Sequence, residues 1–207
     1  MGLFLAMSGV ANSTRAAVED ALRAFATERG GTLDAIDSST DLSEALLIAE
    51  YGNHVTVMYP GDFVQWDDAS EYLSRTLDTS VFSLHIHDED LWMYVLFSKG
   101  QQVDQFNPIP NYWLRKMPES EKLAWSGNAT VVAQHWPGLE PESIGNYLFE
   151  WDLEDDMTEN AYPDDRFPFN DCWQITDFMH RLGLVYPIDD DGKATAATYR
   201  FVIPDRG

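Results

Sequence analysis

Basic residues are scarce in this sequence, and this shortage is its most informative feature. The chain has 13 Lys and Arg against 35 Asp and Glu, a formal net charge of −22 over 207 residues. Such a surface repels nucleic acid and anionic membranes, and it attracts basic partners through long-range electrostatic steering. We therefore expect no direct binding to nucleic acid or to membranes.

Cysteine and long apolar runs are also scarce. Cys172 is the single cysteine, so no disulfide can form within the chain, which is typical of a reducing compartment. No apolar run approaches the ~20 residues that a membrane-spanning helix needs. The apolar residues 3–7 lack the preceding basic residues of a signal peptide. These absences predict a soluble, cytoplasmic protein.

Aromatic residues, in contrast, are plentiful. The chain has 7 Trp, 9 Tyr and 11 Phe, and 44% of its residues are hydrophobic. Disordered acidic segments are poor in aromatic residues, because they cannot bury enough apolar surface to fold. The carboxylates are therefore expected to coat a folded body that is large enough for a substantial core.

Hydrophobic periodicity predicts alternating strands and helices in the first half. Apolar residues recur at helical spacing over residues 15–29 and 67–77. Short runs between turn signals predict strands at residues 3–7, 32–36, 45–50, 55–59, 81–87, 92–97 and 103–106. This order favours an α+β fold with a mostly antiparallel sheet and helices on one face, for which a ferredoxin-like arrangement is one realisation.

The second half is predicted to be mostly helical. We expect short helices over residues 119–125, 129–136 and 142–151, another from Asp171 to Leu182, and a last strand over 194–203. The chain is thus divided into a sheet layer, residues 1–117, and a helical part, residues 118–207. We expect the two parts to form one body.

The segment from 81 to 97 predicts a hairpin with a definite register. A three-residue turn at 88–90 pairs His87 with Leu91 and His85 with Met93. One face of the two strands is then wholly apolar or aromatic and consists of Phe82, Leu84, Ile86, Trp92, Tyr94 and Leu96, while the other face is also largely apolar. An exposed sheet face would be more polar, so we expect both faces to be covered, one of them by the helical part.

Two histidines in this hairpin suggest a metal site. His85 and His87 are two apart on a strand and therefore share a face, with Asp90 nearby in the turn. Zinc accepts two imidazole nitrogens and a carboxylate, so a zinc-dependent hydrolase is one hypothesis. A half-buried strand end followed by an acidic turn explains the same residues without a metal. A glycosidase with paired carboxylates is another alternative, although sequence cannot show the necessary cleft.

Residues 140–171 combine acids with aromatic rings. The stretch holds eleven acids and a single base, Arg166. Aromatic anchors ringed by charge are typical of protein-binding surfaces, where rings supply affinity and carboxylates supply steering. The alternative is an acidic loop whose rings attach it to the core. The predicted contact residues are Trp151, Asp152, Glu154, Asp155, Asp156, Tyr162, Asp164 and Asp165.

Charge and aromatic content together favour a non-enzymatic module that binds a basic protein. An immunity protein or inhibitor that captures a cationic toxin or nuclease is the concrete version of this hypothesis, and a DNA mimic is a variant of it. No cofactor is expected on this hypothesis, whereas the rival metal-dependent hydrolase requires zinc. A third explanation is that the acidity reflects a saline or acidic-proteome source and that the function lies elsewhere.

Overall fold

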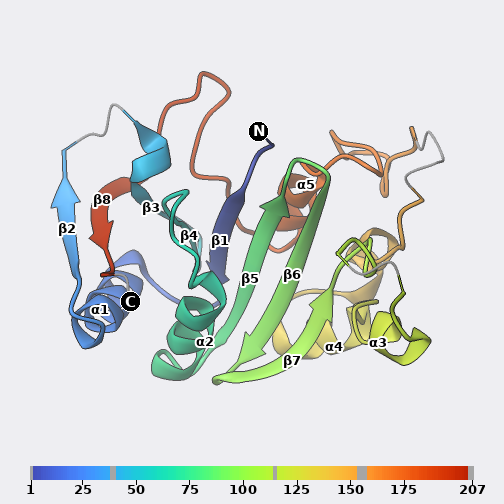
Figure 1. The fold of residues 1–207 in the computed structure, drawn as a ribbon, viewed down its shortest axis with the longest axis horizontal. Coiled ribbons are helices and arrows are strands. Elements are labelled where there is room, and N and C mark those ends of the chain that lie inside the picture. Colours follow the sequence, from blue (N-terminus) through green and yellow to red (C-terminus); the bar gives the residue numbers. More distant parts are fainter. Residues whose placement is uncertain (1, 38–40, 114–115, 153–157, 205–207) are drawn as a thin grey trace.

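The computed structural model describes residues 2–37, 41–113, 116–152 and 158–204, and its centre is an eight-stranded antiparallel sheet (Figure 1). The strand order is β2-β8-β3-β4-β1-β5-β6-β7. The strands are β1 (Leu5–Val10), β2 (Thr32–Ile36), β3 (Leu46–Tyr51), β4 (His54–Met58), β5 (Ser80–His87), β6 (Leu91–Ser98), β7 (Gln101–Phe106) and β8 (Ala197–Val202). The predicted α+β class and antiparallel sheet are confirmed.

Five α-helices accompany the sheet in the described residues: α1 (Arg15–Glu28), α2 (Trp66–Thr76), α3 (Glu119–Leu123), α4 (Ala129–His135) and α5 (Gln174–Arg181). Local chemistry sets the ends of α1. The Thr14 hydroxyl accepts a hydrogen bond from the Ala17 amide, 3.3 Å away, which caps the first turn. At the other end Gly30 adopts a left-handed φ of 77°, and the Gly31 amide donates back to the Ala26 carbonyl.

The helix predicted over residues 142–151 is wrong. Two 3-10 turns replace it, η2 (Pro141–Ser143) and η3 (Gly145–Tyr147), and a further 3-10 turn, η1 (Leu42–Glu44), precedes β3. Gly145 has a high entropic cost in a continuous helix. The tighter turns also bring Tyr147 into a fully buried position.

The helices α1 and α2 cover one face of the sheet. Their apolar residues join those of the neighbouring strands in one cluster, which includes Leu22 and Phe25 of α1, Leu73 of α2, and Val57 of β4. All four side chains are fully buried. At about 25 cal/mol per Å² of buried apolar surface, each contributes about 2 kcal/mol to folding.

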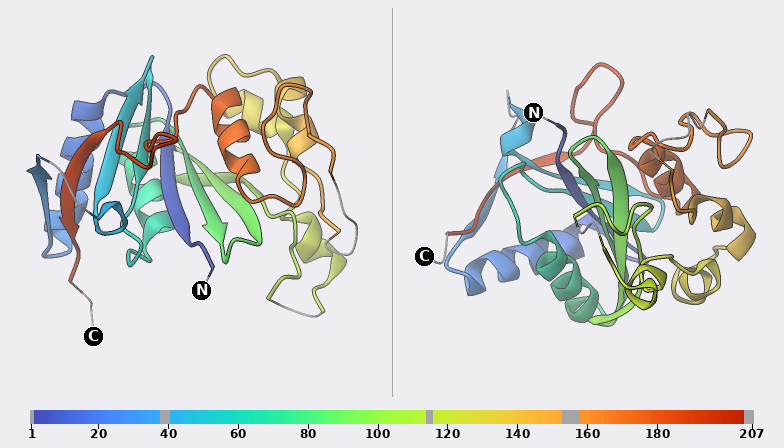
Figure 2. Two further views of the ribbon diagram at one scale, coloured as in Figure 1. Left: turned by 90° about the horizontal axis from the view of Figure 1, so that it is seen from above. Right: turned by 45° about the vertical axis from the view of Figure 1, so that its right-hand side comes forward.

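On the second face of the sheet, the β5–β6 hairpin contacts α5 (Figure 2). Phe178 of α5 is the centre of this contact. Its ring centroid lies 5.0 Å from that of Trp92 and 5.5 Å from that of Tyr94 on β6, and 5.7 Å from that of Phe82 on β5. The even-numbered face of the β5–β6 hairpin is therefore buried, as the sequence pattern predicts.

The last strand enters the sheet far from the segments that precede it in the chain. β8 lies between β2 and β3, pairing Phe201 with Leu33 on one side and Tyr199 with Leu46 on the other. Beyond β3, the order continues as β4, β1 and β5; α2 connects β4 to β5, whereas α1 leads from β1 to β2 at the edge of the sheet. β8 thus joins the C-terminal segment to the sheet that the first half forms.

In the described parts of the chain, no helix combines the length and the apolar character needed to cross a membrane.

Candidate functional site

The β5–β6 hairpin has the predicted register. His87 pairs with Leu91, and His85 pairs with Met93. Both histidines therefore lie on the same face of β5, next to a small hollow of about 30 Å³ that also has Phe4, Phe63 and Trp66 in its wall. This end of the hairpin is the place where the two residues singled out by the sequence meet aromatic residues from other elements.

His85 is the inner of the two histidines. Its ring centroid lies 5.4 Å from that of Trp66, the first residue of α2. Burial, together with the smaller effect of the neighbouring His87, lowers the pKa of His85 from 6.5 to about 4. His85 is therefore neutral at physiological pH, and its protonation opposes folding.

We expect this histidine to make the protein less stable in mild acid. Because the folded-state pKa lies below that of the unfolded chain, the stability is full above pH 6.5 and falls as the pH approaches 4. Between about pH 7 and about pH 5, the free energy of unfolding should fall by about 2 kcal/mol more in the parent protein than in the His85→Gln variant. Urea unfolding at each pH measures this difference. The exposed His180→Gln variant is the control, and equal pH profiles for all three proteins would contradict the assignment.

His87 is surrounded by three aromatic rings, each nearly perpendicular to it. The ring-centroid distances from His87 are 5.0 Å to Phe4, 5.5 Å to Tyr112 and 4.9 Å to Trp113. The Trp113 indole N–H donates a hydrogen bond to His87 Nε2, with the two nitrogens 3.3 Å apart. We call these four residues the His87 cluster. Phe4 is 51% exposed and Trp113 is 52% exposed, so this cluster presents ring surface to solvent.

Three carboxylates border the His87 cluster. Asp88, Glu89 and Asp90 form the turn of the hairpin and are all exposed; we call them the acidic turn. The Tyr112 hydroxyl donates a hydrogen bond to the Asp90 carboxylate, which raises the pKa of Tyr112 to about 12, with smaller contributions from burial and the nearby charges. Rings and carboxylates are therefore held together as one surface.

The acidic turn has an uncommon backbone. Asp88 and Glu89 both have positive φ, 53° and 65°, where hairpin turns usually carry Asn-Gly or Asp-Gly. A left-handed conformation costs a residue other than glycine about 1–2 kcal/mol. The N-terminal segment packs on this turn: the Glu89 amide donates to the Leu3 carbonyl at 3.0 Å, and a Cβ on Gly2 would lie 2.2 Å from Asp88 Oδ1. Glycine at position 2 therefore permits the approach that places Phe4 beside His87.

The metal hypothesis gains no support from the described geometry. His85 and His87 share a face as predicted, but the Asp90 carboxylate accepts from Tyr112. Across the described ranges no group of three or more His, Cys, Asp or Glu is placed to hold a metal ion. The zinc site stays a prediction.

The predicted contact residues of the 140–171 stretch are placed in different surroundings. Trp151 is buried, and its amide donates to the Pro108 carbonyl at 2.8 Å. Asp152 is exposed, whereas Glu154, Asp155 and Asp156 fall outside the described residues. The structure thus brings only part of this set together, around Arg181.

Arg181 of α5 contacts the remaining residues that the sequence predicted for the binding surface. Its guanidinium contacts the carboxylates of Asp164 and Asp165 and lies over the Tyr162 ring, 4.6 Å from the centroid. The Asp165 side chain is only 2% exposed and accepts a hydrogen bond from the Tyr147 hydroxyl at 2.7 Å. At Tyr162 and Asp165, therefore, the side chains make internal contacts that attach the segment to α5.

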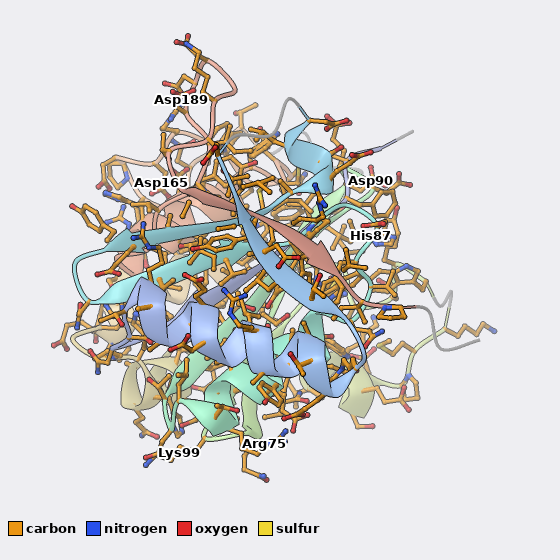
Figure 3. All side chains as sticks on the ribbon, turned by 90° about the vertical axis from the view of Figure 1, so that its left-hand side faces the viewer. Arg75, His87, Asp90, Lys99, Asp165 and Asp189 are labelled. Atoms are coloured by element: carbon orange, nitrogen blue, oxygen red, sulfur yellow. The ribbon has the colours of Figure 1, made fainter. Side chains whose placement is uncertain are left out.

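The two acidic regions lie on different parts of the molecule. Figure 3 shows His87 and Asp90 close together and well apart from Asp165, while the cations Arg75 and Lys99 lie elsewhere again. Sequence reasoning identified His87 and Asp90 but missed Phe4, Tyr112 and Trp113. The run of aromatic residues at 112–113 after two prolines was the signal that could have indicated them.

Comparison with models of known protein families, with curated proteins and with solved structures found no match to this chain.

Proposed function

We propose that this chain is a non-enzymatic binding protein that captures a basic protein, in the manner of an immunity protein or inhibitor acting on a cationic toxin. The observation that carries the proposal is the occurrence of solvent-exposed rings beside consecutive carboxylates on a surface with a large excess of negative charge. Phe4 and Trp113 supply the rings, and the acidic turn supplies the carboxylates.

The excess of acids supports this proposal by simple arithmetic. With 35 acids and 13 bases, 35 − 13 = 22 acids have no base for one-to-one pairing within the chain. Several bases are also committed internally, such as Arg181 to Asp164 and Asp165. Repulsion among the excess carboxylates destabilises the folded state, and a basic partner reduces that repulsion when it binds.

The proposal also extends to the finer description of the fold. In the segment β1–α1–β2–β3–β4–α2–β5, the strands other than β2 have the spatial order β5-β1-β4-β3 with antiparallel neighbours. This order supports a ferredoxin-like unit, to which the extra strands and the second helical layer would be additions. The β5–β6 turn then directly follows the last strand of the ferredoxin-like unit.

Binding of defined cationic peptides tests the proposed function. We expect deca-arginine and deca-lysine to bind in about 50 mM NaCl, and the affinity to fall at least about tenfold in about 500 mM NaCl, because salt screens exposed charges. Isothermal titration calorimetry measures both constants, with a ten-residue Gly/Ser peptide as the neutral control. Absence of binding at low salt, or affinity that is indifferent to salt, would overturn the proposal.

A further inference from the structure

We propose that the His87 cluster, with the acidic turn beside it, is an anchor site for an arginine side chain of the basic partner. This inference rests on the proposed function and makes it more specific, because it names the surface and the side chain that this surface takes. It is carried by the geometry of the rings, the carboxylates and the turn that holds them.

The rings are held in place before any partner arrives. His87 fixes Trp113 through the indole hydrogen bond, and Asp90 fixes Tyr112 through the phenol hydrogen bond. Tyr112 and Trp113 also contact one another edge to face, with centroids 5.2 Å apart. A preorganised surface loses little conformational entropy on binding, so more of the contact energy contributes to affinity.

The described residues leave much of the ring surface of Phe4 and Trp113 uncovered. Phe4 and Trp113 flank the same imidazole, and each leaves about half of its side chain in solvent. Burying large aromatic rings is a major source of binding energy at protein interfaces. The hollow of about 30 Å³ beside Phe4 and His87 has room for one group of about the size of a water molecule.

The carboxylates select a cation for this surface. Asp88, Glu89 and Asp90 are exposed in the adjoining turn, and the positive φ values of Asp88 and Glu89 are retained there in spite of their conformational cost. Among the described residues, no Lys or Arg forms an ion pair with any of these three acids. The site therefore favours a positively charged side chain over a neutral ligand.

Arginine fits this combination better than lysine. Its planar guanidinium can stack on an aromatic face while its N–H groups donate to a carboxylate in two parallel hydrogen bonds. The lysine ammonium is a compact and strongly hydrated charge that gains less from a ring. Neutral sugars also stack on exposed rings, but they gain nothing from the excess of acids, and so we commit to arginine.

The test compares peptides and matched variants under one condition. Calorimetry in about 50 mM NaCl gives the affinities of deca-arginine, deca-lysine and deca-citrulline, the last being a neutral analogue of arginine with nearly the same shape. We expect deca-arginine to bind about threefold tighter than deca-lysine, and deca-citrulline not to bind. The Phe4→Ala/Trp113→Ala variant should bind deca-arginine about fivefold more weakly, because two exposed cation–π contacts are lost.

Two controls separate the site from general charge and from folding. The triple variant Asp88→Asn/Glu89→Gln/Asp90→Asn should weaken deca-arginine binding about tenfold. The same neutralisation of Asp189, Asp190 and Asp191, a second exposed run of acids, should weaken it less than about threefold. Figure 3 shows Asp189 well away from His87 and Asp90. Circular dichroism verifies folding, and Trp113→Leu replaces the double variant if that variant does not fold, because leucine offers no ring for a cation–π contact.

Three outcomes would overturn the inference. If deca-arginine binding is salt-sensitive but unchanged in the Phe4→Ala/Trp113→Ala variant, the anchor site is contradicted and the proposed function is not. Equal losses from the two triple variants would show diffuse attraction without a site. Binding of cellohexaose that requires Trp113 and ignores salt would assign the rings to carbohydrate. Absence of binding by any cationic peptide would instead remove the proposed function itself.

Discussion

Replacing Phe178 with alanine is expected to lower the free energy of unfolding by about 4 kcal/mol. The ring is fully buried and contacts rings on β5 and β6, as well as that of Tyr147, whose centroid lies 5.6 Å away. Truncation leaves a cavity between the sheet and α5 that rigid neighbours cannot fill. Urea denaturation, followed by tryptophan fluorescence and by far-ultraviolet circular dichroism, measures the change.

The two spectroscopic probes also test how the halves of the chain cooperate. Because Phe178 joins the C-terminal half to the hairpin, we expect the two unfolding curves to coincide in the parent protein. Phe149→Ala is the matched control: this ring is 49% exposed, and its loss should cost less than about 1 kcal/mol. A loss near that small value for Phe178→Ala would contradict the described packing.

Replacing Arg181 with leucine is expected to cost about 3 kcal/mol of stability. The Asp165 carboxylate, almost completely buried, would lose the guanidinium whose Nη2 atom lies 3.0 Å away. The Tyr147 hydroxyl and the Tyr162 amide would remain as its hydrogen-bond donors, but among the described residues no ion pair would remain at this carboxylate. Chemical denaturation at neutral pH gives the value.

A second substitution separates the lost charge from lost packing. Adding Asp165→Leu to Arg181→Leu removes both members of the pair, and we expect it to recover at least about 1 kcal/mol of the loss. The exposed pair Arg75–Glu71 is the control, and Arg75→Gln should cost less than about 0.5 kcal/mol. Similar costs for Arg181→Leu and Arg75→Gln would show that the Asp165 carboxylate does not depend on Arg181.

Local sequence patterns were sufficient where contacts are close in the chain. The alternation of residues in the β5–β6 hairpin predicted its register, because a slip by one residue would expose a wholly apolar face. Helical spacing predicted α1 and α2 within two residues of their observed ends. These elements are short-range, and their pattern determines which side of each is buried.

Local patterns could not predict the contacts between segments that are distant in the sequence. Nothing local to residues 194–203 indicates that β8 lies between β2 and β3, since that position depends on which strand edges remain unpaired. The His87 cluster likewise joins Phe4, the strand end and residues 112–113 through tertiary packing alone. The spacing of His85 and His87 is compatible with a metal site and with a half-buried strand end, and it contains no signal for the aromatic rings that surround them in the structure.

Nuclear magnetic resonance of the indole N–H groups during titration with deca-arginine is the sharpest test of the proposed docking surface. The chain has seven tryptophans, and Trp113→Phe and Trp151→Phe variants assign the two signals that matter. We expect the Trp113 signal to shift most, since its ring is exposed beside the acidic turn, and the buried Trp151 signal to stay in place. A titration in which Trp151 shifts and Trp113 does not would contradict the proposed docking surface.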